Sequence, residues 1–234
     1  MQFIVMDFIV VNNVLADAAD ICPRIAAIHR NSVSLSEGKF GFPIHSLAQA
    51  HEPPLRRWYA DWTELFLGML IRLCREAKDR LSWPRDHEDG GGGDFDTLVG
   101  STVPRLLRRL RANGQPIKPC LVHGNLSIDN IAINVATGDP IMFGPAALYA
   151  HNEYELGMWR RENMDLSYFT EYRNHYPPSE PIDEWEDRIC LYGIKFSLAY
   201  LVSTPSATYV QKRYVISFPK QRREGRGCCD DSAG

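Results

Sequence analysis

The residues whose types and spacing could do chemistry lie in one stretch near the middle of the chain, from Cys120 to Ala146. It reads CLVHGNLSIDNIAINVATGDPIMFGPA, and a polar loop separates its first apolar segment from two later ones. We expect a strand at Cys120–His123 and a hairpin that pairs Ile131–Val135 with Ile141–Phe143. The amide side chains of the loop can orient a hydroxyl group or offer oxygen to a hard cation, but they are too weakly basic to take up a proton.

Four positions in this stretch match the arrangement of a kinase-type phosphotransferase. In such enzymes a catalytic-loop Asp lies five positions before a metal-binding Asn, and a second Asp follows a hairpin. Here Asn125 and Asn130 are five positions apart, and Gly144 comes just after the second hairpin strand. We therefore place Asn125, beside His123, at the position of the catalytic base, and Asn130 and Gly144 at the metal-binding positions.

Further motifs along the chain make the match more specific. They are LVHGNL at Leu121–Leu126, IAAIHR at Ile25–Arg30, GKFGF at Gly38–Phe42, the series Trp58, Trp62 and Phe66, YAHNEYELGMWR at Tyr149–Arg160, HYPPSEP at His175–Pro181 and LYGIKF at Leu191–Phe196. With these motifs the chain resembles the fructosamine (ketosamine) 3-kinase family, especially fungal protein-ribulosamine 3-kinases. The resemblance runs from about Met6 to about Pro205.

The resemblance implies a fold, a reaction and its components. The fold would be the C-terminal lobe of a protein-kinase-like enzyme of the aminoglycoside and choline kinase type. Members of the family use ATP and Mg²⁺ to phosphorylate the C3 hydroxyl of sugar adducts on protein lysines, which leads to deglycation. The implied partner is a glycated protein that carries a ketosamine-lysine.

Two site positions depart from the family pattern. Asn125 stands where the family has the Asp that accepts or orients the proton of the substrate hydroxyl, and Gly144 stands where the family has a metal-binding Asp. Glycine supplies no side-chain ligand, and Asn130 by itself cannot hold Mg²⁺. Asp129 is adjacent, but neighbouring residues in an extended loop tend to point apart, so we do not expect it to compensate.

A third departure concerns the start of the chain. Residues 1–11 resemble a remnant of the hinge strand that joins the two lobes of such a kinase, so we expect the N-terminal lobe, with its nucleotide clamp, to be missing. Residues 12–205 would form the C-lobe, with an acidic glycine-rich loop at 85–96, and residues 206–234 a divergent, disordered tail. These losses argue against binding of ATP and Mg²⁺ by this chain, and we expect no useful kinase activity.

Three interpretations of the chain remain open. It could be a pseudokinase-like member of the enzyme lineage, with activity absent or residual. It could be a non-catalytic module that binds glycated protein or another partner. It could also be a truncated gene product without a selected function.

The periodicity of apolar residues predicts a mainly helical α+β protein. The strongest pattern runs through Trp58, Trp62, Leu65, Phe66, Met69, Leu70, Leu73 and Ala77 at three- and four-residue steps. Further helices are expected at Ala16–Arg30, Leu98–Leu110 and Glu184–Val202. Met1–Val11 is typical of a strand, although no upstream segment could pair with it.

Composition narrows the partners. The 234 residues include 26 Lys and Arg against 29 Asp and Glu, which gives a net charge of -3. Without a basic excess, binding to nucleic acid or to an anionic membrane is not expected. No apolar run approaches the ~20 residues of a membrane helix, and Asp7 interrupts the one segment that could begin a secretory signal. We therefore expect a cytoplasmic protein.

Overall fold

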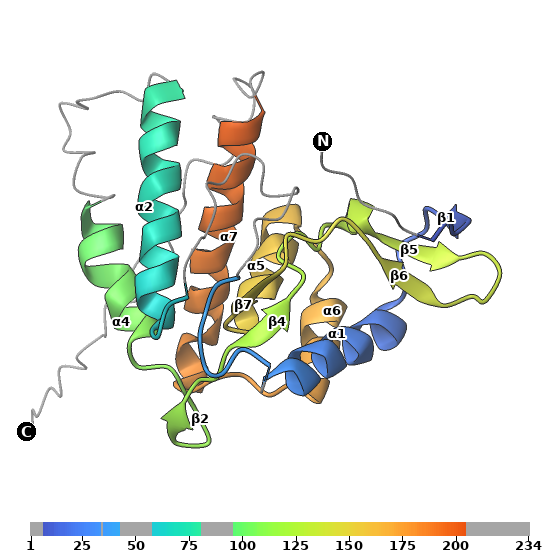
Figure 1. Cartoon of the computed structure of the whole chain (residues 1–234), viewed down its shortest axis with the longest axis horizontal. Coiled ribbons are helices and arrows are strands. Elements are labelled where there is room, and N and C mark those ends of the chain that lie inside the picture. Colours follow the sequence, from blue (N-terminus) through green and yellow to red (C-terminus); the bar gives the residue numbers. More distant parts are fainter. Residues whose placement is uncertain (1–6, 34, 43–57, 81–95, 205–234) are drawn as a thin grey trace, which may run out of the picture.

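The computed structural model describes residues 7–33, 35–42, 58–80 and 96–204 (Figure 1). Three predictions therefore lie wholly or mostly outside the described ranges. They are the first six residues of the predicted strand Met1–Val11, the acidic glycine-rich loop at 85–96, and the disordered tail at 206–234. Among the described residues, no helix combines the length and the apolar content that crossing a bilayer would require.

Three long helices form one half of the described structure. Helix α7 (Trp185–Ser203) packs against both α2 (Trp62–Arg80) and α5 (Glu153–Glu162) (Figure 1). A π-helical turn (Leu98–Thr102) leads into the short helix α4 (Val103–Leu107), which also contacts α2 and α7. The apolar stripe of α2 is the centre of this core, where Leu65, Phe66, Leu70 and Leu73 are buried.

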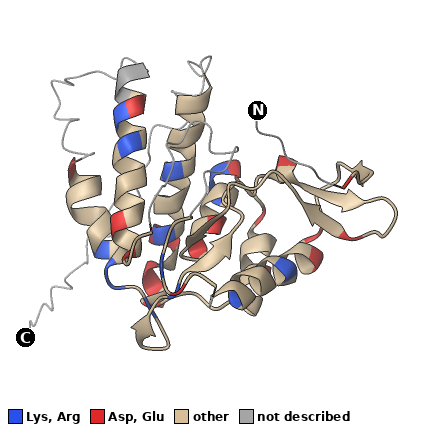
Figure 2. Cartoon of the chain, viewed as in Figure 1, with Lys and Arg blue, Asp and Glu red and all other residues tan. Residues whose placement is uncertain are grey.

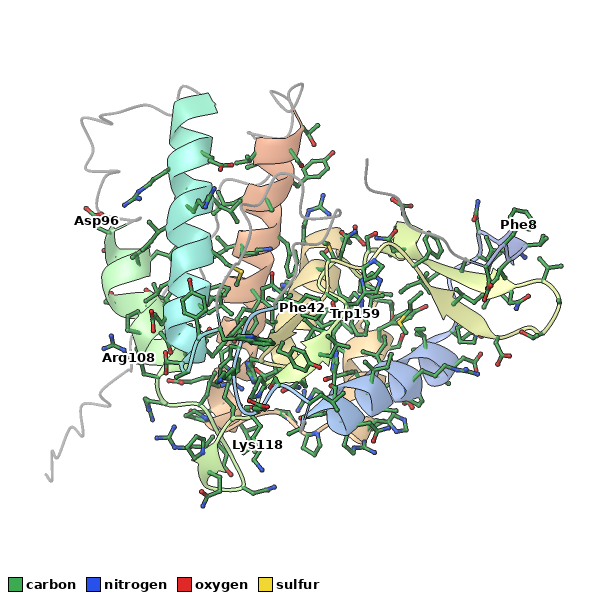
Figure 3. The ribbon with its side chains drawn as sticks, viewed as in Figure 1. Phe8, Phe42, Asp96, Arg108, Lys118 and Trp159 are labelled. Atoms are coloured by element: carbon green, nitrogen blue, oxygen red, sulfur yellow. The ribbon has the colours of Figure 1, made fainter. Side chains whose placement is uncertain are left out.

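A second core lies on the other side of α5. There, α1 (Ala18–Ser32) packs against α6 (Leu166–His175), and Trp159 of α5 is fully buried between them and the polar loop. Figure 3 shows Trp159 in the interior, whereas Phe8 lies at the periphery beside β1, where it is 94% exposed. Residues of both charge signs are spread over these helices (Figure 2).

Three small antiparallel sheets complete the described fold. The first sheet has the strand order β1-β5-β6, where β1 is Val11–Asn12, β5 is Ile131–Asn134 and β6 is Pro140–Met142. The second sheet pairs β4 (Cys120–Val122) with β7 (Leu148–Ala150), with Leu121 opposite Tyr149. The third pairs β2 (Arg111–Ala112) with β3 (Gln115–Pro116).

The structure confirms the expected helices at Ala16–Arg30 and Glu184–Val202 to within two residues, and it confirms the strand and the hairpin of the central stretch. Two other helices differ from prediction. Trp58 precedes α2 because Asp61 caps the helix by accepting a hydrogen bond from the Glu64 N–H at 2.9 Å. The predicted helix Leu98–Leu110 ends at Leu107, since the backbones of Arg111 and Glu180 pair with each other and draw the chain into β2.

The predicted N-terminal strand, Met1–Val11, is too long in its described part, and the expectation that it has no partner is wrong. Residues 7–10 are not in a strand, and only Val11–Asn12 form β1. β1 does have a partner, which lies downstream: it pairs with β5, and Val10 accepts a hydrogen bond from the N–H of Val135 at 3.0 Å. The apolar composition indicated a strand, but the partner lies more than a hundred residues away in sequence.

Candidate functional site

The polar loop of the central stretch lies between two strand pairs that hold its ends. It leaves β4 at Val122, passes through a 3₁₀ turn at Ile128–Asn130 and enters β5. The turn at Phe143–Ala146, which links β6 to β7, runs alongside the loop. Because β4 pairs with β7 and β5 pairs with β6, the loop and the turn are brought together at the same end of both sheets.

The structure brings Asn125, Asn130 and Gly144 together. The side-chain N–H of Asn125 donates to the carbonyl oxygen of Gly144 at 3.0 Å, and the side-chain N–H of Asn130 donates to the backbone carbonyl of Asn125 at 2.7 Å. A Cβ atom added to Gly144 would lie 3.2 Å from Oδ1 of Asn130. The three positions therefore form one site, although Gly144 is 19 residues beyond Asn125.

His123 stabilises the loop through both of its ring nitrogens. Its Nδ1 accepts a hydrogen bond from the Asn125 N–H at 3.3 Å, so Nε2 carries the proton and donates to the carbonyl of Phe143 at 3.0 Å. Burial lowers the pKa of His123, with nearby Glu155 and the Phe143 carbonyl opposing the shift. A neutral ring with both nitrogens occupied ties the loop to the turn.

Glu155, on α5, holds the start of the loop, a role that was not predicted from the sequence. Its carboxylate is completely buried and accepts hydrogen bonds from the backbone N–H groups of His123 and Gly124, the latter at 2.9 Å. Nε2 of His29 lies 3.6 Å from the same carboxylate. Both His29 and Glu155 belong to motifs of the family resemblance, IAAIHR and YAHNEYELGMWR, which was the available signal.

Gly124 is required by the close approach of the turn to the loop. Its φ is +72°, a left-handed conformation that favours glycine, and a Cβ atom there would lie 2.4 Å from the carbonyl oxygen of Ala146. That approach allows the N–H of Ala146 to donate to the carbonyl of His123 at 2.8 Å. Glycine is therefore a geometric requirement at position 124 of this loop.

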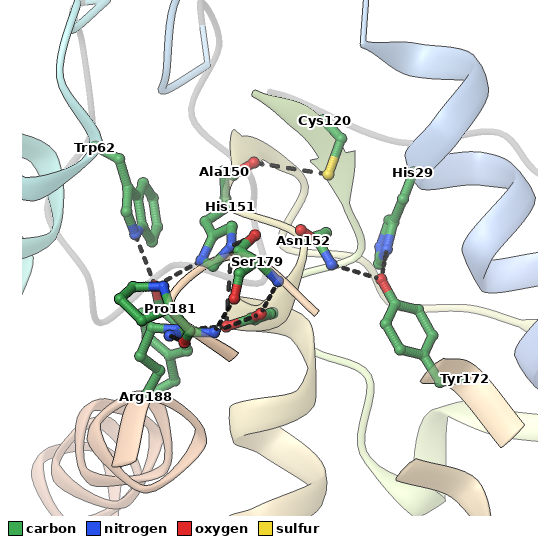
Figure 4. A network of polar contacts seen from close by, with 12 residues as sticks. His29, Trp62, Cys120, Ala150, His151, Asn152, Tyr172, Ser179, Pro181 and Arg188 are labelled. Atoms are coloured by element: carbon green, nitrogen blue, oxygen red, sulfur yellow. Dashed lines mark hydrogen bonds and ion pairs between the residues drawn. The ribbon is translucent and has the colours of Figure 1, made fainter. Parts of the chain in front are cut away.

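A buried polar network supports α5 from below the loop (Figure 4). Arg188 of α7 pairs with Glu153 through contacts of 2.6 and 3.0 Å, and it also donates to the carbonyl oxygens of Ser179 and Pro181, each at 2.7 Å. His151 contacts the hydroxyl of Ser179 at 2.9 Å. The network ties α5, α7 and the segment at 179–181 to one another.

A second branch of the network reaches α1, α2 and α6. The hydroxyl of Tyr192 lies 2.8 Å from Nδ1 of His151 and accepts a hydrogen bond from the Trp62 indole at 2.9 Å. The hydroxyl of Tyr172 similarly lies 2.8 Å from Nδ1 of His29 and accepts from the Asn152 amide at 3.0 Å. Figure 4 shows both branches converging on the residues that immediately follow β7.

The buried His151 predicts a loss of stability in mild acid. Burial lowers its pKa well below the usual value, with smaller contributions from Arg188 and His29. In the unfolded chain a histidine takes up a proton below about pH 6.5, whereas in the folded protein His151 stays neutral. We therefore expect its contribution to the free energy of unfolding to be intact above that pH and to fall by up to about 1.4 kcal/mol per unit below it.

Urea unfolding of the wild type and of His151→Gln, at neutral pH and in mild acid, measures this contribution. The difference between the two slopes against pH isolates His151 from the other titrating groups, including Glu153, whose pKa is raised by burial despite the opposing effect of Arg188. Identical slopes for the two proteins would show that His151 does not behave as expected.

The residues at the metal-binding positions do not fit Mg²⁺. Gly144 supplies no side chain, and the amide nitrogens of Asn125 and Asn130 are used in hydrogen bonds to backbone carbonyls, so these positions offer a cation only two neutral amide oxygens. Asp129 is exposed on the 3₁₀ turn. Within the described ranges, no group of three or more His, Cys, Asp or Glu residues could hold a metal ion. A hard cation normally requires carboxylate ligands, and these positions supply none.

Comparison with known proteins identifies the lineage. The family model described as fructosamine kinase matches residues 1–216. The chain belongs to the fructosamine kinase family. It is 26% identical over 196 residues to protein-ribulosamine 3-kinase, chloroplastic, of Arabidopsis thaliana, covering 82% of this chain and 54% of that protein. It is 28% identical over 164 residues to ketosamine-3-kinase of Mus musculus, covering 67% and 46%.

Solved structures with the fructosamine kinase fold resemble this chain as well. Two crystal structures, each named "putative fructosamine-3-kinase", come from Thermobifida fusca and Haemophilus somnus. Their TM-scores are 0.61 and 0.60, at 19% and 17% identity. They cover 83% and 87% of this chain, and 61% and 64% of their own chains are matched. The predicted kinase-like fold, with helices and small sheets, is confirmed at this level.

The chain spans about half the length of the curated relatives it matches. The proposed loss of an N-terminal lobe and the proposed domain boundaries stay predictions, as do the roles assigned to Asn125, His123, Asn130 and Gly144. The recognition of the family from short motifs is confirmed.

Proposed function

We propose that this chain is a ketosamine or ribulosamine 3-kinase relative in which phosphoryl transfer is severely impaired. The reaction of the lineage would be the ATP- and Mg²⁺-dependent phosphorylation of the C3 hydroxyl of a ketosamine on a protein lysine. One observation carries the impairment: Asn125 donates a hydrogen bond to the carbonyl oxygen of Gly144. The position of the base is thus occupied by a donor, and the position of a metal ligand by a residue without a side chain.

The chemical consequence follows from the groups present. An Asp in place of Asn125 could accept the proton of a substrate hydroxyl as the hydroxyl attacks phosphorus, whereas an amide can only orient it. Neither His123 nor Glu155 takes over this role, because both ring nitrogens of His123 are hydrogen-bonded and the buried carboxylate of Glu155 is held by two backbone N–H groups. The scaffold of the loop is retained while its reactive groups are replaced.

The direct test is phosphate transfer from labelled ATP, in the presence of Mg²⁺, to a protein glycated with ribose or fructose. Mouse ketosamine-3-kinase serves as the reference enzyme. Loss of the positioned base alone typically removes ~10²–10⁴ in rate, and we expect at least this deficit for the purified chain. A rate in the range of the reference enzyme would contradict the proposal.

A second candidate is a non-catalytic module that recognises glycated protein. It is favoured by the retention of an ordered polar loop, whose backbone is clamped by Glu155 and whose amides could orient sugar hydroxyls. The test is retention of the chain on immobilised glycated protein relative to the same protein without sugar. Equal retention on both would exclude this candidate.

A further inference from the structure

Two side-chain amides close the loop onto the neighbouring turn. Nδ2 of Asn125 faces the carbonyl of Gly144, and Nδ2 of Asn130 faces the carbonyl of Asn125. Each acceptor is a backbone carbonyl oxygen, so only a side chain with a hydrogen-bond donor can make these contacts. An ionised Asp at either position has no proton to donate, and it would set a carboxylate oxygen against the carbonyl.

Backbone hydrogen bonds extend the same junction. The N–H of Phe143 donates to the carbonyl of Asn130 at 3.1 Å, and the N–H of Ala146 donates to the carbonyl of His123 at 2.8 Å. Oδ1 of Asn130 lies 3.2 Å from the place where a side chain on Gly144 would begin. The amide therefore occupies the side of the turn where a carboxylate at residue 144 would start.

Positions 125, 130 and 144 of the junction carry no carboxylate, so they hold no negative charge that a cation would need to neutralise. Carboxylates crowded into one site repel one another, and a bound divalent cation is one way in which proteins relieve that repulsion. Here neutral amides make direct hydrogen bonds across the junction instead. The closed arrangement of the loop and the turn is thus complete with groups that belong to the chain.

We propose that the amides of Asn125 and Asn130 hold the loop closed against the 143–146 turn without a divalent cation, which makes this a metal-independent structural junction. The inference deepens the proposed function and rests on it for one point. That point is that these residues stand where the lineage has its catalytic base and its metal ligands. It accounts for Asn at position 125, because the side-chain amide donates to the backbone carbonyl of residue 144 and a carboxylate could not.

The test compares Asn125→Asp with Asn134→Asp in the full chain. Asn134 is a matched control because its Oδ1 accepts from the Ala136 N–H at 2.9 Å, a role that a carboxylate oxygen fills equally well. Thermal melting is measured for the wild type and both variants, in excess EDTA and in millimolar Mg²⁺. Amide hydrogen exchange over residues 123–130 is measured under the same conditions.

We expect the wild type to show the same Tm and the same exchange with EDTA and with Mg²⁺. Without metal, Asn125→Asp is expected to lower Tm by about 2–4 °C and to speed exchange in the loop, whereas Asn134→Asp leaves both unchanged. A Tm of the wild type that rises with Mg²⁺, or an Asn125→Asp variant as stable as the Asn134→Asp control, would overturn the inference. Neither outcome depends on phosphate transfer, so failure of the junction and failure of the proposed function are distinguishable.

Discussion

Replacing Arg188 by methionine is expected to lower the free energy of unfolding by about 3–5 kcal/mol. Arg188 is fully buried and Glu153 is 1% exposed, so removal of the guanidinium leaves a buried carboxylate without its counter-charge. The carbonyl oxygens of Ser179 and Pro181 also lose the hydrogen bonds from Arg188, although Pro181 still accepts one from the Glu184 N–H at 3.2 Å. Urea unfolding monitored by tryptophan fluorescence measures the effect.

Arg105→Met is the matched control for this substitution. Arg105 also pairs with a glutamate, Glu184, at 2.9 Å, but its side chain is 51% exposed, and such pairs contribute at most about 1 kcal/mol. The double variant Glu153→Leu/Arg188→Met should recover much of the loss, because no unpaired charge then remains buried. Equal effects of Arg188→Met and Arg105→Met would show that the buried ion pair contributes no more to stability than the exposed one.

Lowering the pH should reduce the loss of stability caused by Arg188→Met. Burial already raises the pKa of Glu153 in the wild type, and Arg188 opposes that shift. Without Arg188 the pKa of this carboxyl should rise further in the folded state, so protonation on lowering the pH neutralises the buried charge and stabilises the folded variant relative to its unfolded chain. The difference in free energy of unfolding between the variant and the wild type is therefore expected to decrease as the pH falls.

Replacing Glu155 by alanine is expected to lower the free energy of unfolding by about 2–6 kcal/mol. This range is the cost of two unsatisfied backbone donors at about 1–3 kcal/mol each. The donors are the N–H groups of His123 and Gly124, which the buried carboxylate holds at the start of the loop. Chemical denaturation gives the magnitude, and hydrogen exchange should show faster opening at residues 123–125.

Glu162→Ala provides the control at the other end of the same loop. Glu162 accepts one backbone hydrogen bond, from Ile128 at 2.7 Å, at a site that water can reach. Its removal should cost about 0.5–1.5 kcal/mol. Glu155→Gln retains one acceptor oxygen and should fall between the two, so the comparison holds even if Glu155→Ala does not fold. A ranking in which Glu162→Ala is the more damaging change would refute the role given to Glu155.

Local patterns were sufficient to predict much of the fold. The stripe through Leu65, Phe66 and Leu70 indicated α2 because a helix repeats every 3.6 residues. A helix with one buried face therefore has apolar residues at that spacing in its sequence. The hairpin β5–β6 was predictable because its strands are joined by a short turn at Gly138. These elements depend on residues that are close together in sequence.

The polar loop was found from the spacing of its residues, which also identified the family. What that spacing could not reveal is the hydrogen bond between Asn125 and Gly144, since its geometry depends on β4 pairing with β7. The same is true of β1, whose partner β5 lies far along the chain. Contacts between distant segments leave no periodic signal in either segment alone.

The sequence by itself therefore determined the lineage and the main helices, and it led to the prediction that Asn125 and Gly144 replace two acidic residues. Tertiary structure alone decided that those two residues bond to each other and that Glu155, from a helix beyond the turn, clamps the loop. The physical reason is that side-chain type sets which interactions a residue can make, whereas the choice of partner depends on how the cores around α5 pack.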